Sequence, residues 1–290
     1  MKRDIPDFKT RAIQTHQHLS HETINQMLDA GLAWDLAPAL SAGGSIIFPH
    51  VGIEVCGHQI ASAVHACLNC GAERVLVVGV LHALTQELQD ARVRVATGSD
   101  VTQEEAWGIQ GPGLKGRKDW QHEFSLLHFL FLWDEEIKRR GIKGPELIVR
   151  YPYLAGGRPF ILPGIEELQH IVRDGAAVVM TSDPFHHGIG YDDAPEDSLY
   201  AEQGGLELAR QRIEEGLEML TIGDYWGFNQ HCAYVAKNDA RDGGQVVRYS
   251  LGPLHGKIHD IVWEDMAPSY HKPDPTWVTG ALIEMLPVKA

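Results

Sequence analysis

The apolar run at residues 74–80 (RVLVVGV) constrains the fold most strongly, because it has the length of a single strand. A strand that is apolar on both faces is typical of a parallel sheet covered by helices on both sides. A second run of this kind occurs at residues 45–48 (SIIF), and a helical pattern over residues 55–70 ends before Gly71. Together these segments predict a βαβ unit with a right-handed crossover.

The rest of the chain continues the alternation of strand and helix patterns. Further strands are predicted at residues 91–96, 146–149, 176–181 and 246–251, and helices at residues 123–140, 165–172, 198–220 and 276–285. A glycine-rich loop is expected over residues 108–116, and residues 1–40 read as a peripheral helical segment. This order predicts one α/β domain over residues 1–290, with a central mixed, mainly parallel sheet and helices on both faces.

Composition narrows the possible partners. The chain has 290 residues, of which 44% are hydrophobic, so it can bury a substantial core. Its net charge of −14 argues against binding to nucleic acid or to an anionic membrane surface. We find no signal-peptide pattern and no apolar run of the roughly 20 residues that a membrane span needs, so a cytoplasmic location is expected.

Histidines follow three of the predicted buried strands. His50 comes just after the first strand, His82 just after the second, and His186 and His187 follow the strand at residues 176–181. In open α/β sheets, ligands bind outside the carboxyl ends of the strands. Imidazole is a common ligand for iron, copper and zinc, so this edge of the sheet is predicted to hold a metal.

Two other types of active site have no support in the sequence. The segment after the first strand (PHVGIEVCG) lacks the G-x-G-x-x-G pattern, so no nucleotide cofactor is expected. No G-x-S-x-G nucleophile pattern occurs either.

The segments 121–128 and 150–151 add further candidates. His122 stands at the entrance of a predicted helix and is a candidate for the site, whereas His128, on another face of the helix, is expected to pack. Glu123 could contact substrate or could only complement the helix dipole. Arg150 and Tyr151 follow a strand at the same edge and are candidates for binding a polar substrate.

Four short motifs in order resemble a known family. They are residues 49–52 (PHVG), 80–82 (VLH), 121–125 (QHEFS) and 182–186 (SDPFH), and the similarity is concentrated in residues 45–190. In these motifs the chain resembles the Memo family, which is similar in fold to the class III extradiol dioxygenases. The closing segment 277–282 (WVTGAL) resembles the last helix of that family.

The resemblance implies a metal held by His50, His82 and a third ligand. In Memo-like proteins that ligand is a cysteine, and Cys232 occupies the corresponding place, with His231 as the adjacent rival. In ring-cleaving relatives the position is a glutamate. The neighbours Leu81 and Ala233 depart from the family pattern, so the pocket is expected to be unusually apolar and the substrate cannot be carried over.

The resemblance also implies acid–base residues and an activity. His186 would be the acid–base histidine, Asp183 its neighbour and His122 a second histidine of the site. The favoured function is an Fe(II) dioxygenase that uses O₂ and a small catechol-like or other oxygen-bearing substrate. A copper- or iron-binding redox or interaction protein without turnover stays open, since thiolate suits Cu(I), and so does a zinc hydrolase. Whether the chain forms a homo-oligomer is left open.

Overall fold

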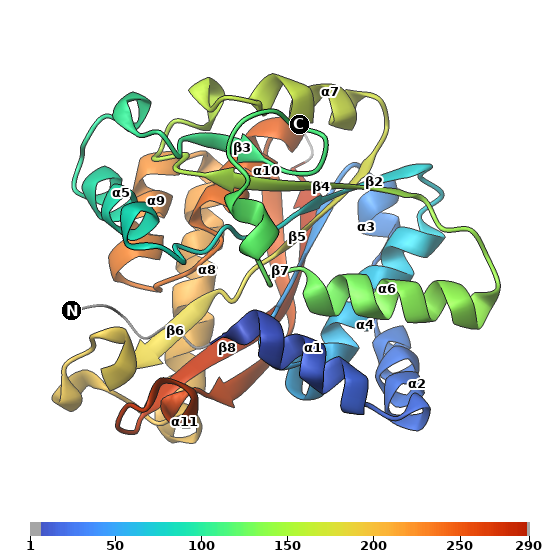
Figure 1. Cartoon of the computed structure of the whole chain (residues 1–290), viewed down its shortest axis with the longest axis horizontal. Helices are drawn as coiled ribbons and strands as arrows, with labels where there is room; N and C mark the ends of the chain where they lie inside the picture. The colour runs from blue at the N-terminus through green and yellow to red at the C-terminus, as the bar shows by residue number, and fades with distance from the viewer. Residues whose placement is uncertain (1–6, 289–290) are drawn as a thin grey trace.

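The computed structural model describes residues 7–288, and a mixed sheet of eight strands forms its centre (Figure 1). The strand order is β3-β4-β2-β5-β1-β8-β6, and β7 pairs with β8. The strands are β1 (Ser45–Phe48), β2 (Arg74–Val78), β3 (Gly108–Gln110), β4 (Glu146–Tyr153), β5 (Ala177–Thr181), β6 (Phe185–Gly188), β7 (Leu254–Asp265) and β8 (Thr276–Pro287).

The middle of the sheet is parallel and its flanks are antiparallel. Strand β5 pairs in parallel with both β1 and β2, and β2 pairs in parallel with β4. Strand β8 runs antiparallel to β1, β6 and β7, and β3 runs antiparallel to β4. The carboxyl ends of β1, β2 and β5 therefore open at one edge of the sheet.

Helices cover both faces of this sheet (Figure 1). They are α1 (Phe8–His18), α2 (His21–Ala30), α3 (Ala37–Ser41), α4 (Ile53–Asn69), α5 (Gln86–Ala96), α6 (Leu127–Arg140), α7 (Ile165–Arg173), α8 (Leu206–Ile222), α9 (Tyr225–Tyr234), α10 (Arg241–Leu251) and α11 (Ala267–Tyr270). Short 3₁₀ helices join them, among them Asp119–His122 before α6. None of the helices within residues 7–288 is both long and apolar enough to cross a membrane.

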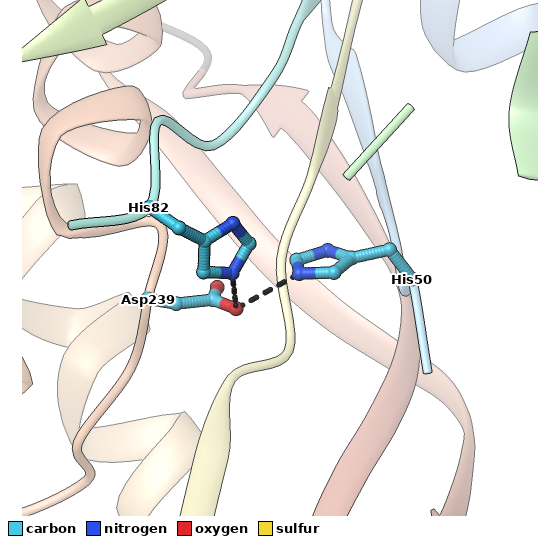
Figure 2. A group of neighbouring side chains, drawn as sticks. All are labelled: His50, His82 and Asp239. Carbon is cyan, nitrogen blue, oxygen red and sulfur yellow. Dashed lines mark ion pairs between the residues drawn. The ribbon is translucent and has the colours of Figure 1, made fainter. Parts of the chain in front are cut away.

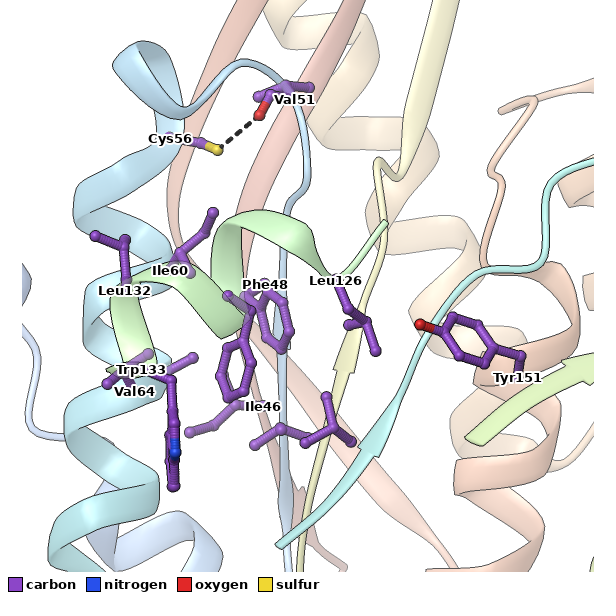
Figure 3. Packing of buried hydrophobic residues seen from close by; sticks show 14 of the residues in the cluster. Ile46, Phe48, Val51, Cys56, Ile60, Val64, Leu126, Leu132, Trp133 and Tyr151 are labelled. Atoms are coloured by element: carbon purple, nitrogen blue, oxygen red, sulfur yellow. Dashed lines mark hydrogen bonds between the residues drawn. The ribbon is translucent and has the colours of Figure 1, made fainter. Parts of the chain in front are cut away.

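The two faces bury separate hydrophobic clusters because successive side chains of a strand point to opposite sides. Ile46 and Phe48 of β1 join α2, α4 and α6 in one cluster (Figure 3). Phe48 stacks there on Phe129, at 4.8 Å between ring centroids. Ile47 points the other way, into a cluster with α7, α8 and α10. Both faces of the central strands are thus covered by packed side chains, and the loops at the carboxyl ends start from this packed layer.

The predicted βαβ unit is confirmed, but three predicted elements are wrong. Residues 91–96 belong to helix α5 and residues 246–251 to helix α10, whereas residues 276–285 lie in strand β8. The sheet consequently has more antiparallel pairing than the mainly parallel one predicted. The segment TWVTGALIEMLP is mostly apolar and does not alternate, and in such a run periodicity cannot separate a strand from a buried helix. Its pairing with β1, β6 and β7 decides the matter.

Candidate metal centre

Three loops bring polar side chains to the carboxyl edge of the parallel strands. His50 follows β1, His82 follows β2 after a short loop, and Asp183 follows β5. A fourth loop, between α9 and α10, carries Asp239 to the same place. Figure 2 shows His50, His82 and Asp239 converging from these separate segments.

His50, His82 and Asp239 are arranged like the ligands of a single metal ion. One ligand atom from each lies within 4.8 Å of the others. Nε2 of His50 is 3.0 Å from Oδ2 of Asp239, and Nε2 of His82 is 3.7 Å from the same oxygen. The two imidazole rings are nearly perpendicular, at 82°, so their Nε2 atoms approach the carboxylate from different directions.

The outer nitrogen of each imidazole is already engaged. Nδ1 of His50 lies 2.9 Å from Oγ1 of Thr181, and Nδ1 of His82 lies 3.0 Å from Oε2 of Glu123. The backbone N–H of His82 also donates to Oε1 of Glu123, at 2.8 Å. A hydrogen bond donated from Nδ1 fixes the tautomer in which Nε2 carries a lone pair, and this is the usual support for a metal-binding histidine. Both lone pairs then face the centre.

The two carboxylate oxygens of Asp239 differ in their hydrogen bonding. Its Oδ1 accepts a hydrogen bond of 3.0 Å from the backbone N–H of Asp183. Its Oδ2 is buried and has no hydrogen-bond partner of good geometry among the described residues, although His50 lies close by. A buried carboxylate oxygen without a donor is costly unless a cation meets it. Two imidazole lone pairs and this oxygen therefore fit a divalent transition-metal ion.

Asp183 positions His50 through the backbone. Its Oδ1 accepts from the N–H groups of His50 and Val51, at 2.8 and 3.2 Å, and so holds the turn that follows β1. The Cys56 thiol donates to the carbonyl of Val51, at 3.2 Å, and ties the same turn to α4 (Figure 3). Burial and the neighbouring Asp239 raise the pKa of Asp183 to about 7, against an attraction from His50.

The metal-free centre holds protons where a metal would bind. Burial opposes charge on His82, but Glu123 and Asp239 outweigh it and raise the pKa of His82 to about 10. Burial also disfavours the charged form of Asp239, which would raise the pKa of its carboxyl group. The neighbouring His50 and His82 outweigh burial and lower this pKa. Metal binding to such a site must displace protons from the histidines, so it is linked to pH.

His186 is a neutral base beside the three ligands. Its Nδ1 is buried without a hydrogen-bond partner among the described residues, and its ring lies edge-on to Tyr191, at 4.9 Å. Burial lowers the pKa of His186 to about 4, and it interacts electrostatically with Asp239 and His50. At neutral pH this imidazole is therefore uncharged, with the Nδ1 position free of any partner among the described residues.

The predicted third ligand, Cys232, does not join the group. It lies on α9, buried against Leu220 and Phe228, and burial raises the pKa of its thiol. Its neighbour His231 faces Arg212, with Nε2 2.8 Å from that backbone carbonyl. Asp239 takes the place instead. Nothing in the sequence marked this aspartate except its position in a polar loop after α9.

Two predicted histidines lie outside the group. The side chain of His122 is exposed at the end of the 3₁₀ helix, whereas the next residue, Glu123, is buried and bonds His82. His187 is adjacent to His186 in β6 but points to the other side, where Nδ1 lies 2.9 Å from Oδ2 of Asp193. Alternation along a strand separates the two neighbours.

The predicted substrate contacts have structural partners. Arg150 forms an ion pair with Glu167 at 2.5 Å and donates to the carbonyl of Val149 at 2.8 Å. Tyr151 is buried in the core beside Trp120, at 6.4 Å between ring centroids. Glu123 accepts hydrogen bonds from the backbone N–H and the ring of His82. His128 is buried and bonds His16 at 2.8 Å, in agreement with its predicted packing role.

Aromatic side chains close one side of the centre. The ring of Phe124 stacks on His82 at 4.4 Å with an angle of 15°. Phe8 of α1 packs on the far side of this contact, 5.3 Å from Phe124, and also meets Tyr270 at 5.8 Å. The N-terminal helix therefore supports the wall that holds His82.

No model of a known protein family matches the chain, and no curated protein matches it.

Proposed function

We propose that the chain is a non-haem metal-dependent oxidoreductase of the class III extradiol dioxygenase or Memo-like type. It would work with Fe(II), O₂ and a small oxygen-bearing substrate such as a catechol. The observation that carries this proposal is the convergence of two supported imidazoles and a spare carboxylate oxygen on one point.

The ligand set favours iron over copper. Two histidines and one carboxylate with open positions are typical of non-haem Fe(II) oxygenases, whereas soft thiolate ligands favour Cu(I). The thiol of Cys232 is packed elsewhere, so the feature that favoured a copper redox protein is missing from the group. The sequence resemblance to the Memo family points to the same class of fold.

The chain's own residues would prepare the substrate. His186, neutral at physiological pH, would accept the proton of a substrate hydroxyl and return it later, a role that typically contributes 10²–10⁴-fold to rate. Glu123 and Thr181 would hold the two imidazoles in place. Phe124 would shield the His82 side from water. Fe(II) bound by His50, His82 and Asp239 would relay electrons from the substrate, which is oxidised, to O₂, which is reduced.

Zinc fits the same three residues. Two histidines and a carboxylate also hold catalytic zinc in hydrolases, and His186 would serve a hydrolase equally well. An oxygenase and a zinc hydrolase must therefore be distinguished by the metal that the protein contains and by whether it consumes O₂.

The test has two steps. The metal content of protein purified without added metal is measured first, and the metal-free protein is then loaded anaerobically with Fe(II). Oxygen uptake is followed over a panel of catechols, with Zn(II)-loaded protein as the control. We expect uptake that depends on both Fe(II) and a catechol. Stoichiometric iron without uptake on any phenol would refute the oxygenase, and ester hydrolysis by the zinc form would favour the hydrolase.

A further inference from the structure

Helix α1 packs beside the metal centre but buries little of its own surface. Of its eleven residues, only Ala12 is buried. Helix α4, which begins just after the turn that carries His50, buries twelve of its seventeen residues. Most of the stability of a helix in a protein comes from the packing of its apolar face. Helix α1 is therefore held much more weakly than α4.

The C-terminal half of α1 is anchored to α6 by one side chain. Nε2 of His16 lies 2.8 Å from Nδ1 of His128, which is buried. The ring of His16 also stacks on Phe131, at 4.1 Å between centroids and an angle of 7°. His16 thus makes both a polar and a stacking contact with the same helix.

The N-terminal half of α1 is held by polar contacts that are open to water. Nζ of Lys9 donates to the carbonyl of Gln121 at 2.6 Å, and Nη1 of Arg11 donates to Oγ of Ser269 at 2.9 Å. Both hydrogen bonds are exposed. Such bonds contribute little net stability, because water can replace either partner.

The ring of Phe8, the first residue of α1, joins two walls of the centre. It lies 5.3 Å from the ring of Phe124, which stacks on the candidate ligand His82. In another direction it lies 5.8 Å from the ring of Tyr270, at an angle of 68°. Phe8 is only partly buried by these contacts.

The second wall leads to the neutral histidine of the site. Tyr270 meets Tyr191 edge-on at 5.6 Å, and Tyr191 meets His186 edge-on at 4.9 Å. Phe8 therefore completes an arc of aromatic rings that begins at His82 and ends at His186. Movement of Phe8 away from the centre would divide this arc in its middle.

We propose that α1 is a hinged cover of the metal centre, with His16 at the hinge and Phe8 as the latch. Closure completes the arc and excludes water, whereas opening admits metal and substrate. Lids of this kind are drawn from the least stable parts of a structure, as the sparse burial of α1 requires. The admission of substrate rests on the proposed function, but the opening of α1 requires neither metal nor turnover.

The first test follows hydrogen exchange of the full chain without metal, by mass spectrometry. We expect the amides of α1 to exchange at least about 100-fold faster than those of α4, through local opening. Phe8→Ala should speed exchange in α1 by a further factor of about 10 to 100, as the loss of two ring contacts implies, and should leave α4 unchanged. Protection of α1 equal to that of α4 would overturn the proposal.

The second test measures how fast Zn(II) enters the metal-free protein and how fast a chelator removes it. A looser cover speeds both steps by the same factor, so Phe8→Ala should raise both rates about 10- to 100-fold and leave the dissociation constant unchanged. Phe8→Tyr keeps the ring, and Gln14→Ala changes an exposed position of α1, so both controls should keep the wild-type rates. Weaker affinity with an unchanged rate of entry would show that Phe8 only supports His82, which would also overturn the proposal.

The outcomes separate this inference from the proposed function. If the protein binds no metal while α1 exchanges fast and responds to Phe8→Ala, the oxygenase is refuted and the cover is upheld. Iron-dependent O₂ uptake on catechols, with α1 as protected as α4, would have the opposite meaning.

Discussion

Replacing Asp239 by asparagine should abolish tight metal binding while leaving the fold intact. Asparagine keeps an oxygen for the N–H of Asp183 but puts an amide where the spare Oδ2 faces the two imidazoles. Two unit charges 4 Å apart interact by about 4 kcal/mol at an effective dielectric constant of 20, and a divalent cation experiences more. The dissociation constant for Fe(II) or Zn(II) should therefore rise by at least about three orders of magnitude.

The matched control is Cys232→Ser. Because Cys232 packs against Leu220 and Phe228 away from the group, this variant should bind metal as the wild type does and lose only some stability. Affinity is measured by competition with a chelator under anaerobic conditions, and circular dichroism verifies the fold. The assignment of Asp239 as ligand is refuted if Asp239→Asn keeps wild-type affinity, and more so if Cys232→Ser loses the metal.

Three further predictions follow from the same centre. Thr181→Val removes the hydroxyl that orients His50 and should weaken metal affinity about 10- to 100-fold, measured by competition with a chelator. The control is Ser62→Ala, which removes a buried hydroxyl bonded to the carbonyl of Gly31 and should leave metal affinity unchanged. Equal metal affinities of the two variants would contradict the supporting role of Thr181. His186→Gln should lower the rate of O₂ uptake about 10²–10⁴-fold with metal affinity unchanged, while the exposed His122→Gln should leave the rate within about twofold; the opposite ranking would restore His122 as the acid–base residue. Folding raises the pKa of His82 from 6.5 to about 10, so its contribution to stability is complete below pH 6.5 and is lost as pH rises toward 10. Melting curves of the metal-free protein, recorded across this pH range, should show the loss. If His82→Gln shows the same loss of stability, His82 is not its cause.

The sequence predicted the βαβ unit and the two histidines because the signals for them are local. An apolar strand indicates the buried central sheet, and the polar residue that follows it indicates the edge of the sheet where ligands bind. Thus β1, α4 and β2 were predicted correctly, and His50 and His82 lie where the strand ends indicated. Residues 276–285 were misread, because apolar content without periodicity does not choose between helix and strand.

Other features depend on contacts between distant parts of the chain. Asp239 joins the histidines across more than 150 positions of sequence, and its Oδ2 faces them while its Oδ1 accepts from the N–H of Asp183. Glu123 was read as a helix-end or substrate residue, and only its approach to His82 gives it an orienting role. The sequence by itself determined the α/β class and the edge that carries His50 and His82. Tertiary structure alone decided that Asp239 joins the two histidines, that His122 is exposed and that Cys232 lies elsewhere, because each follows from which segments meet at that edge.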